Sequence, residues 1–231
     1  MLYPCEASVL IFSGNDAVKF LNSVSTNLID FSSDENKSIN TSICNNKGKL
    51  VNYLTVFKIG DAIPAICHMA KPGELIDFLN PKILTQEVNI RDISKLNVLE
   101  YQISEEHQNE SISRFQSVTI VPLYQNLQIK ITPSADWKQS QYASMSDWDN
   151  WRVENMYPTY PQELSRTLTP YNCGLGDYVH NSKGCYVGQE ILTRMYSRNS
   201  FGKTLKRVKK GISQQKYITT VGVENCLEIS K

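Results

Sequence analysis

Apolar residues recur three or four positions apart, the spacing of a helical face, in several stretches of the chain. A helix is predicted after Asn15 or Asp16, either of which can cap it. Further helices are predicted after the segment 71–73, from Ser146 onward, and over 191–196. The predicted inward faces are Ala17, Phe20, Leu21 and Val24, then Leu75, Phe78 and Leu79, and then Trp148, Trp151 and Asn155.

Other stretches are rich in β-branched and aromatic residues between turn signals, which is typical of strands. The run 50–59 follows the turn 45–48 and ends at Gly60. Shorter strands are predicted over 96–103, 117–124 and 126–132, and two or three more near the C-terminal end. No internal repeat is visible, and the irregular alternation of helices and strands predicts an α+β protein with mixed sheets.

Two stretches carry neither pattern. Residues 104–113 are polar and are predicted to form a surface loop. Residues 157–182 are rich in Pro, Asn, Gly and Tyr and are predicted to be irregular. Because long irregular segments are uncommon in compact domains, this one is expected to serve a site.

The 231 residues carry a formal net charge of +1, which gives no general attraction to nucleic acid or anionic membranes. The stretch 203–210 is locally basic; it could contact RNA phosphates, but lysines also protect exposed strand edges. No apolar run approaches the roughly 20 residues of a membrane-spanning helix. The first residues, MLYPCEASVL, lack the features of a secretory signal, so a cytoplasmic protein is expected.

The six cysteines are scattered, without the paired spacings of zinc or cluster sites, and no metal site is predicted. The three histidines, His68, His107 and His180, are far apart, and structural or surface roles are expected for each. Reduced, mostly buried thiols are the expectation for the cysteines of a cytoplasmic chain.

One segment concentrates candidate chemistry: residues 183–190, KGCYVGQE, before the predicted helix 191–196. Gly184 and Gly188 permit backbone geometry and close approach that a side chain would forbid. Cys185 lies ahead of a helix N-terminus and close to Lys183, and both features favour a reactive thiolate. The alternative is that Cys185 simply packs under the loop as a small apolar residue.

The same segment carries the form K-G-C-Y-x-G-Q-E at every specified position, and Arg194, Tyr196 and Arg198 match an A-R-x-x-Y-R-type continuation, with Asn199 in place of a glycine. Other matching positions are Gly14, Asp16, Phe20, Leu21, Thr26 and Asn27; Lys47, Gly48, Val56 and Phe57; and Arg152, Glu154 and Pro158, where Asn155 and Met156 replace Ala-Gly. These positions resemble the YgfZ-like folate-binding proteins, relatives of the aminomethyltransferase T-protein.

The resemblance extends over most of residues 8–200. It implies a three-lobed fold with mixed, largely antiparallel sheets around a central folate-type pocket. The folate-binding region would span 1–200, with lobes of about 1–95 and 96–200. Residues 201–231 are too few for the roughly five strands of the family's C-terminal barrel, so that lobe is expected to be short or incomplete.

The resemblance also implies tetrahydrofolate or another reduced folate as ligand. Glu154 is expected to bind the pterin ring, since a carboxylate can accept hydrogen bonds from its donor edge. Arg152 could hold a folate carboxylate, although a surface ion pair would also explain it. The further expected folate contacts are Tyr186, Gln189 and Arg194, and the expected supporting residues of the motif are Gly184, Gly188 and Glu190.

The family is linked to assembly or repair of iron–sulfur clusters in client enzymes, and to tRNA modification that depends on such enzymes. Cys185 with Lys183 would carry that activity. One thiolate cannot hold a cluster, which usually needs four, so other ligands would come from an assembly or client protein, a small thiol or a second chain.

Position 52 bears on the alternative, a folate-dependent aminomethyltransferase. T-proteins carry a catalytic aspartate there, whereas this chain has Asn52, which cannot supply the negative charge. Aminomethyl transfer is therefore not expected. A third hypothesis is an RNA or tRNA-modification binding module that uses 203–210.

Overall fold

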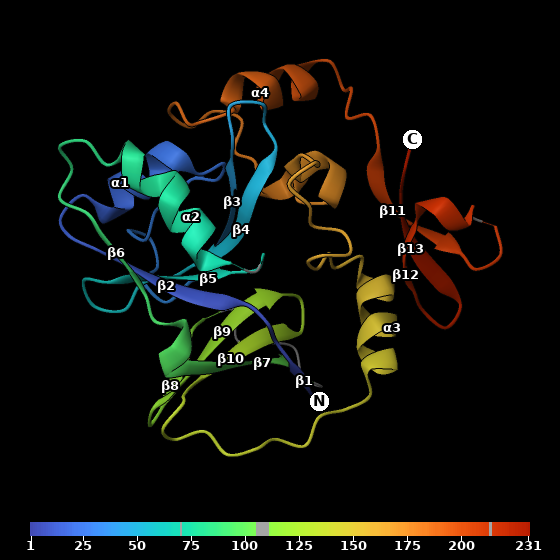
Figure 1. The fold of residues 1–231 in the computed structure, drawn as a ribbon, viewed down its shortest axis with the longest axis horizontal. Helices are drawn as coiled ribbons and strands as arrows, with labels where there is room; N and C mark the ends of the chain where they lie inside the picture. The colour runs from blue at the N-terminus through green and yellow to red at the C-terminus, as the bar shows by residue number, and fades with distance from the viewer. Residues whose placement is uncertain (70, 105–110, 213) are drawn as a thin grey trace.

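The computed structural model of the chain describes residues 1–69, 71–104, 111–212 and 214–231 (Figure 1). Within these ranges the strands form two five-stranded sheets and one three-stranded sheet, with antiparallel pairing throughout. His107 and most of the loop predicted over 104–113 lie outside the described residues. No helix in these ranges is both long and apolar enough to cross a membrane.

The first sheet has the strand order β3-β4-β5-β2-β6. Its strands are β2 (Ser8–Ser13), β3 (Ile39–Cys44), β4 (Leu50–Val56), β5 (Ile63–Cys67) and β6 (Asn89–Asp92). Helices α1 (Ala17–Val24) and α2 (Pro72–Leu79) pack their apolar residues into the same core as this sheet. The predicted inward face of α1 is confirmed, because Ala17, Phe20, Leu21 and Val24 are all buried.

Strand β4 is buried along its whole length because both of its faces are covered. Leu54 and Val56 belong to the core shared with the helices. Tyr53, on the opposite face, belongs to a core formed with the irregular C-terminal half of the chain. This double burial explains the nearly continuous apolar run that predicted the strand.

The second sheet has the order β1-β7-β10-β9-β8. Its strands are β1 (Leu2–Pro4), β7 (Asn97–Ile103), β8 (Ser113–Phe115), β9 (Val118–Tyr124) and β10 (Leu127–Pro133). The tight turn predicted before β10 is present, with Gln125 at a positive φ of 48°. Because β1 pairs with β7, the first residues of the chain belong to this sheet and not to the first.

The second half of the chain joins these sheets to a small C-terminal one (Figure 1). Helices α3 (Met145–Asn155) and α4 (Gln189–Ser197) flank the irregular segment that was predicted between them. Short 3₁₀ turns are η1 (Asn80–Lys82), η2 (Ser94–Leu96), η3 (Pro170–Cys173), η4 (Gly176–Tyr178) and η5 (Gln215–Tyr217).

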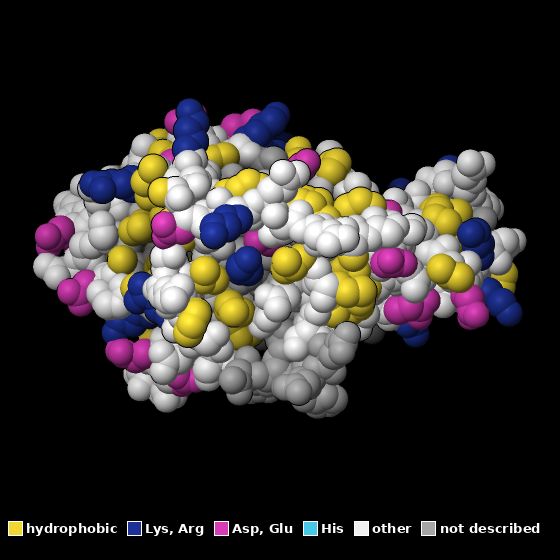
Figure 2. Space-filling view, turned by 90° about the horizontal axis from the view of Figure 1, so that it is seen from below, with side chains coloured by type: hydrophobic (Ala, Val, Ile, Leu, Met, Phe, Trp, Pro, Cys, Tyr) yellow, Lys and Arg dark blue, Asp and Glu magenta, His cyan; other side chains and the backbone are white. Residues whose placement is uncertain are grey.

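Strands β11 (Thr204–Lys209), β12 (Ile218–Val221) and β13 (Asn225–Ser230) form the third sheet, in the order β11-β13-β12. In the described part of the chain it does not close into a barrel. The sheet rests on α3 through Val153, Leu205 and Leu227. In Figure 2 this lobe projects from the main body.

Candidate functional site

The KGCYVGQE segment is held against the β3–β4 turn by its second glycine. Gly188 has a φ of +85° and precedes α4. A Cβ there would lie 2.4 Å from the carbonyl oxygen of Asn45 and 3.2 Å from the Cα of Gly48. No other residue type fits this contact, so the motif requires Gly188 for packing. Gly184, in contrast, has open space around it.

Lys183 anchors the segment to the end of α1. Its Nζ donates hydrogen bonds to the backbone oxygens of Ser25 (2.8 Å) and Asn27 (2.6 Å), and to Oδ1 of Asn22 (3.4 Å). Three acceptors match the three N–H groups of an ammonium. Burial lowers the pKa of Lys183 to about 8. Among the described residues, no hydrogen bond or ion pair joins it to Cys185.

Cys185 is exposed, as a reactive thiol must be. Cys5 is half-buried; the buried cysteines are Cys44, Cys67, Cys173 and Cys226. The alternative that Cys185 packs under its loop is therefore wrong.

The other motif residues predicted to contact folate have separate surroundings. Tyr186 is 8% exposed and packs in an apolar core with Leu192, and burial raises the pKa of its phenol. Gln189 donates from Nε2 to the backbone oxygen of Lys183 at 3.4 Å. Arg194 and Glu190 are exposed on α4. Their predicted roles stay predictions.

A central cavity of about 260 Å³ lies where β1, the end of β5, α3 and the segment after α3 meet. Its aromatic wall is formed by Trp148 and Tyr101, whose rings stack with their centroids 4.7 Å apart. Its polar lining residues are Glu6, His68, Asp149, Arg152, Thr159 and Gln162. These residues come from segments far apart in the sequence.

Arg152 is the most deeply buried of these charged residues, at 2% exposure. Its Nη1 donates to Oε2 of Glu163 at 2.7 Å, and its Nη2 donates to Oδ1 of Asp149 at 2.9 Å. Nη2 also lies 2.8 Å from Oγ1 of Thr220. The pair is thus not the surface ion pair considered from sequence. Nε of Arg152 is buried and has no acceptor in the described part of the chain.

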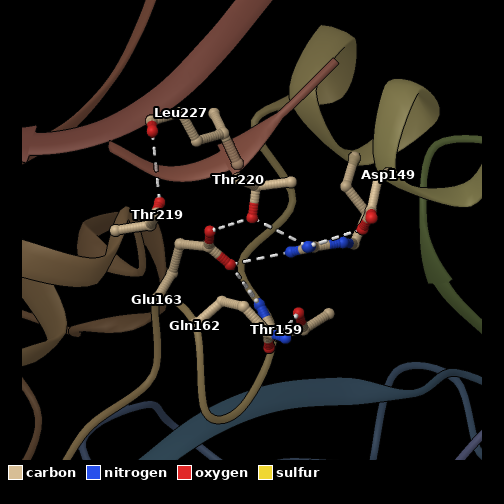
Figure 3. Close-up of polar contacts among 8 residues, drawn as sticks. Asp149, Thr159, Gln162, Glu163, Thr219, Thr220 and Leu227 are labelled. Atoms are coloured by element: carbon tan, nitrogen blue, oxygen red, sulfur yellow. Dashed lines mark hydrogen bonds and ion pairs between the residues drawn. The ribbon is translucent and has the colours of Figure 1, made fainter. Parts of the chain in front are cut away.

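Glu163 completes this network with no solvent exposure. Its Oε2 accepts from the backbone N–H of Thr159 at 3.1 Å, and its Oε1 accepts from the hydroxyl of Thr220 at 2.6 Å. Because Thr220 belongs to β12, the carboxylate ties α3, the segment after it and the C-terminal sheet together (Figure 3). Arg152, which lines the cavity, is therefore held in position by a buried ion pair with Glu163.

Glu154, the residue expected to bind the pterin, has other partners. Its Oε2 accepts from Arg207 at 3.1 Å and its Oε1 accepts from Asn225 at 2.8 Å. Two positions apart on a helix, Glu154 and Arg152 point to different faces. Glu154 is not among the residues that line the cavity. Its role in binding stays a prediction.

His68 lines the cavity, although the sequence suggested only a structural or surface role. The ring stacks on Tyr53 with centroids 4.7 Å apart, and Nε2 lies 2.8 Å from Oγ1 of Thr55. Burial lowers the pKa of His68 to about 3, so the imidazole is neutral near pH 7. The cavity thus contains an uncharged imidazole beside a carboxylate and a guanidinium.

Asn52 is fully buried and serves the backbone. Its Nδ2 donates to the carbonyl oxygen of Met69 at 3.0 Å, and its Oδ1 accepts from the N–H of Met69 at 3.2 Å. An aspartate at this position could not make the first of these hydrogen bonds unless it were protonated. The amide of Asn52 is therefore explained by its two hydrogen bonds to the backbone of Met69.

The basic stretch 203–210 is partly neutralised. Arg207 pairs with Glu154, and Lys206 donates to the backbone oxygen of Lys231 at 2.6 Å. On the face shown in Figure 2, acidic and basic side chains alternate over this lobe. No group of three or more His, Cys, Asp or Glu side chains in the described ranges is arranged to hold a metal ion.

The sequence did not indicate Asp149, Glu163, Trp148 or His68 as site residues. For Asp149 a signal existed, because it lies three positions before Arg152 and therefore on the same helix face. For Glu163 and His68 no local signal exists, since their burial depends on distant segments.

No family profile matches the chain. An aminomethyltransferase from Bacillus cytotoxicus is 33% identical over 86 residues, which are 36% of this chain and 23% of that protein. The match thus spans about a quarter of the length of that curated relative. The crystal structure of glycine cleavage system aminomethyltransferase T from Bartonella henselae superposes with a TM-score of 0.77, at 11% identity, and the match covers 99% of this chain and 77% of that one.

Proposed function

We propose that this chain binds a reduced folate with the pterin ring in the central cavity, as an accessory protein and not as an aminomethyltransferase. Its fold is that of the glycine-cleavage aminomethyltransferases, as the resemblance in sequence implied. The observation that carries this proposal is the cavity itself, in which an aromatic wall faces a carboxylate, a buried guanidinium and a neutral imidazole.

The lining residues suit a pterin. Trp148 and Tyr101 line the cavity with apolar ring atoms, and their rings are held in place by stacking on each other. Asp149 can accept hydrogen bonds from the amino group and ring N–H of the pyrimidine edge. When bound, a reduced folate would supply the chemistry of a one-carbon carrier.

The volume and the charged lining of the cavity limit which part of a folate it can hold. Ligand pockets commonly measure about 300–1,000 Å³, so a cavity of about 260 Å³ suits the ring end of a folate. Glu6 and Asp149 would repel the carboxylates of the glutamate tail, whereas the charge of Arg152 is already balanced by Glu163. The tail is therefore expected to remain in solvent.

The residues do not favour aminomethyl transfer. Asn52 has both amide groups bonded to Met69 and carries no charge for a protonated amine or iminium. A T-protein-like transferase activity remains the alternative, and turnover of a one-carbon unit on tetrahydrofolate by the purified chain would favour it.

Cys185 supports the finer part of the proposal, a role in iron–sulfur cluster assembly or repair. Its thiol is exposed within a segment that matches the YgfZ-type motif at each specified position. A cluster would be cargo, and a partner would supply the remaining ligands. Client enzymes that retain full activity in cells carrying only Cys185→Ala would contradict this role.

Calorimetric titration with tetrahydrofolate under anaerobic conditions tests the ligand proposal. The wild type should bind saturably, and Asp149→Asn should bind about 10- to 150-fold more weakly, the equivalent of roughly 1.5–3 kcal/mol for a hydrogen bond to a charged group. Glu154→Gln is the matched comparison, because this carboxylate lies outside the cavity. A loss of affinity in Glu154→Gln but not in Asp149→Asn would instead show that Glu154 binds the pterin, as the sequence suggested.

A further inference from the structure

A hydrogen-bond chain behind the cavity fixes the tautomer of His68. The chain starts at the backbone oxygen of Leu123, which can only accept, and Nδ2 of Asn40 donates to it at 2.9 Å. The Oδ1 of Asn40 is therefore directed to Thr55, whose hydroxyl donates to it at 2.6 Å. The single hydroxyl proton of Thr55 is then used.

Thr55 must consequently accept at its 2.8 Å contact with His68. The imidazole has to carry its proton on Nε2, and Nδ1 is left as an unprotonated acceptor. No partner for Nδ1 is found in the described ranges, and His68 lines the cavity. The stacked ring of Tyr53 holds the imidazole plane.

This arrangement distinguishes two kinds of polar group in the cavity. Asp149 and Nδ1 of His68 both accept, whereas the guanidinium of Arg152 is a donor whose Nη atoms already bond Glu163, Asp149 and Thr220. A ligand must therefore bring at least two donor groups. A pterin brings the amino group and N–H of its pyrimidine ring in any oxidation state. Its other ring has N–H donors only when it is reduced, because the oxidised nitrogens carry lone pairs instead.

We propose that His68 is a specificity-determining residue whose Nδ1 accepts a hydrogen bond from an N–H of the reduced pterin ring, so that the cavity binds reduced folates and rejects oxidised ones. This inference rests on the proposed folate function and adds the oxidation state of the ligand to it. Against an oxidised ring, two lone pairs would face each other in a buried site, and neither would be satisfied.

Titrations with tetrahydrofolate and with folic acid test the proposal. The wild type should prefer tetrahydrofolate by about 5- to 150-fold, the scale of leaving a buried polar group unsatisfied. His68→Phe keeps a ring to stack on Tyr53 but removes the acceptor, so it should lose most of this preference. His180→Phe is the matched control, because His180 is not among the cavity-lining residues.

A second measurement needs no variant of the cavity. In protein labelled with ¹⁵N-histidine, the imidazole resonances of His68 should report a proton on Nε2 in the ligand-free state. Adding tetrahydrofolate should shift the Nδ1 resonance, and folic acid should not. A proton on Nδ1, or equal ligand preference in His68→Phe and wild type, would overturn the proposal while leaving folate binding intact. No binding of tetrahydrofolate by the wild type would overturn both.

Discussion

Removing Arg152 should destabilise the protein far more than removing an exposed arginine. Arg152 is 2% exposed and Glu163 is fully buried, so Arg152→Met leaves a buried carboxylate without a cation. Breaking a buried pair in this way costs about 3–5 kcal/mol. The remaining partners of Glu163, the N–H of Thr159 and the hydroxyl of Thr220, are neutral donors and compensate only in part.

Replacing Glu163 should cost less stability than replacing Arg152. In Glu163→Gln, Arg152 keeps Asp149 as its counter-charge at 2.9 Å, and the amide oxygen can still accept. The loss should therefore be about 1–3 kcal/mol, the range for disturbing one buried hydrogen-bonding group. In the double variant Arg152→Met/Glu163→Gln the buried charge is gone, so the total should fall well below the sum of the single losses.

Urea denaturation of the four proteins gives the free energies of unfolding for this cycle. Arg166→Met is the control, because Arg166 and Glu74 form an ion pair at 46% and 41% exposure. Such exposed pairs contribute about 0–1 kcal/mol. Single losses that add within about 0.5 kcal/mol, or a loss in Arg152→Met no larger than that in Arg166→Met, would show that the buried pair is not coupled in this way.

Three further predictions concern other parts of the site. The pKa of His68 is about 3 in the folded protein and roughly 6.5 in the unfolded chain, so between these pH values only the unfolded chain gains a proton, and the free energy of unfolding should fall by about 1.4 kcal/mol per pH unit below 6.5. Urea denaturation at pH 7 and pH 5 should show a smaller loss of stability for His68→Phe than for the wild type. An equal loss in the two proteins would contradict this. Gly188→Ala should cost more than about 1–2 kcal/mol because of its φ of +85° and the contact with Asn45, whereas Gly184→Ala should be nearly neutral in the same assay. Cys185 should be alkylated by iodoacetamide in the native protein well before the four buried cysteines, and peptide mass spectrometry that finds a buried cysteine modified first would count against its accessibility.

The local pattern of apolar residues was sufficient to predict the helices and strands whose burial follows the sequence periodicity. The inward face of α1 could be predicted because Phe20, Leu21 and Val24 are neighbours on one helix. Strand β4 could be predicted because two covered faces leave an unbroken apolar run. The motif lysine was identified, but its partners were not, since Ser25 and Asn27 lie more than 150 positions away in the sequence.

The cavity could not be predicted because no single segment contains it. Glu163 looks like an ordinary surface residue until Arg152 and Thr220 surround it. His68 has no neighbour in sequence that indicates a cavity, and its tautomer depends on Thr55 and the segments beyond it. Similarity in sequence indicated the fold. Which side chains line the cavity depends instead on how α3 packs against the second sheet and the C-terminal sheet.

The most direct test is a crystal structure of the chain with tetrahydrofolate bound. We expect electron density for the pterin ring against Trp148 and Tyr101, with the pyrimidine edge at Asp149, a reduced-ring N–H at Nδ1 of His68, and the glutamate tail in solvent. Density for the ligand beside Glu154 or α4, with an empty central cavity, would contradict it.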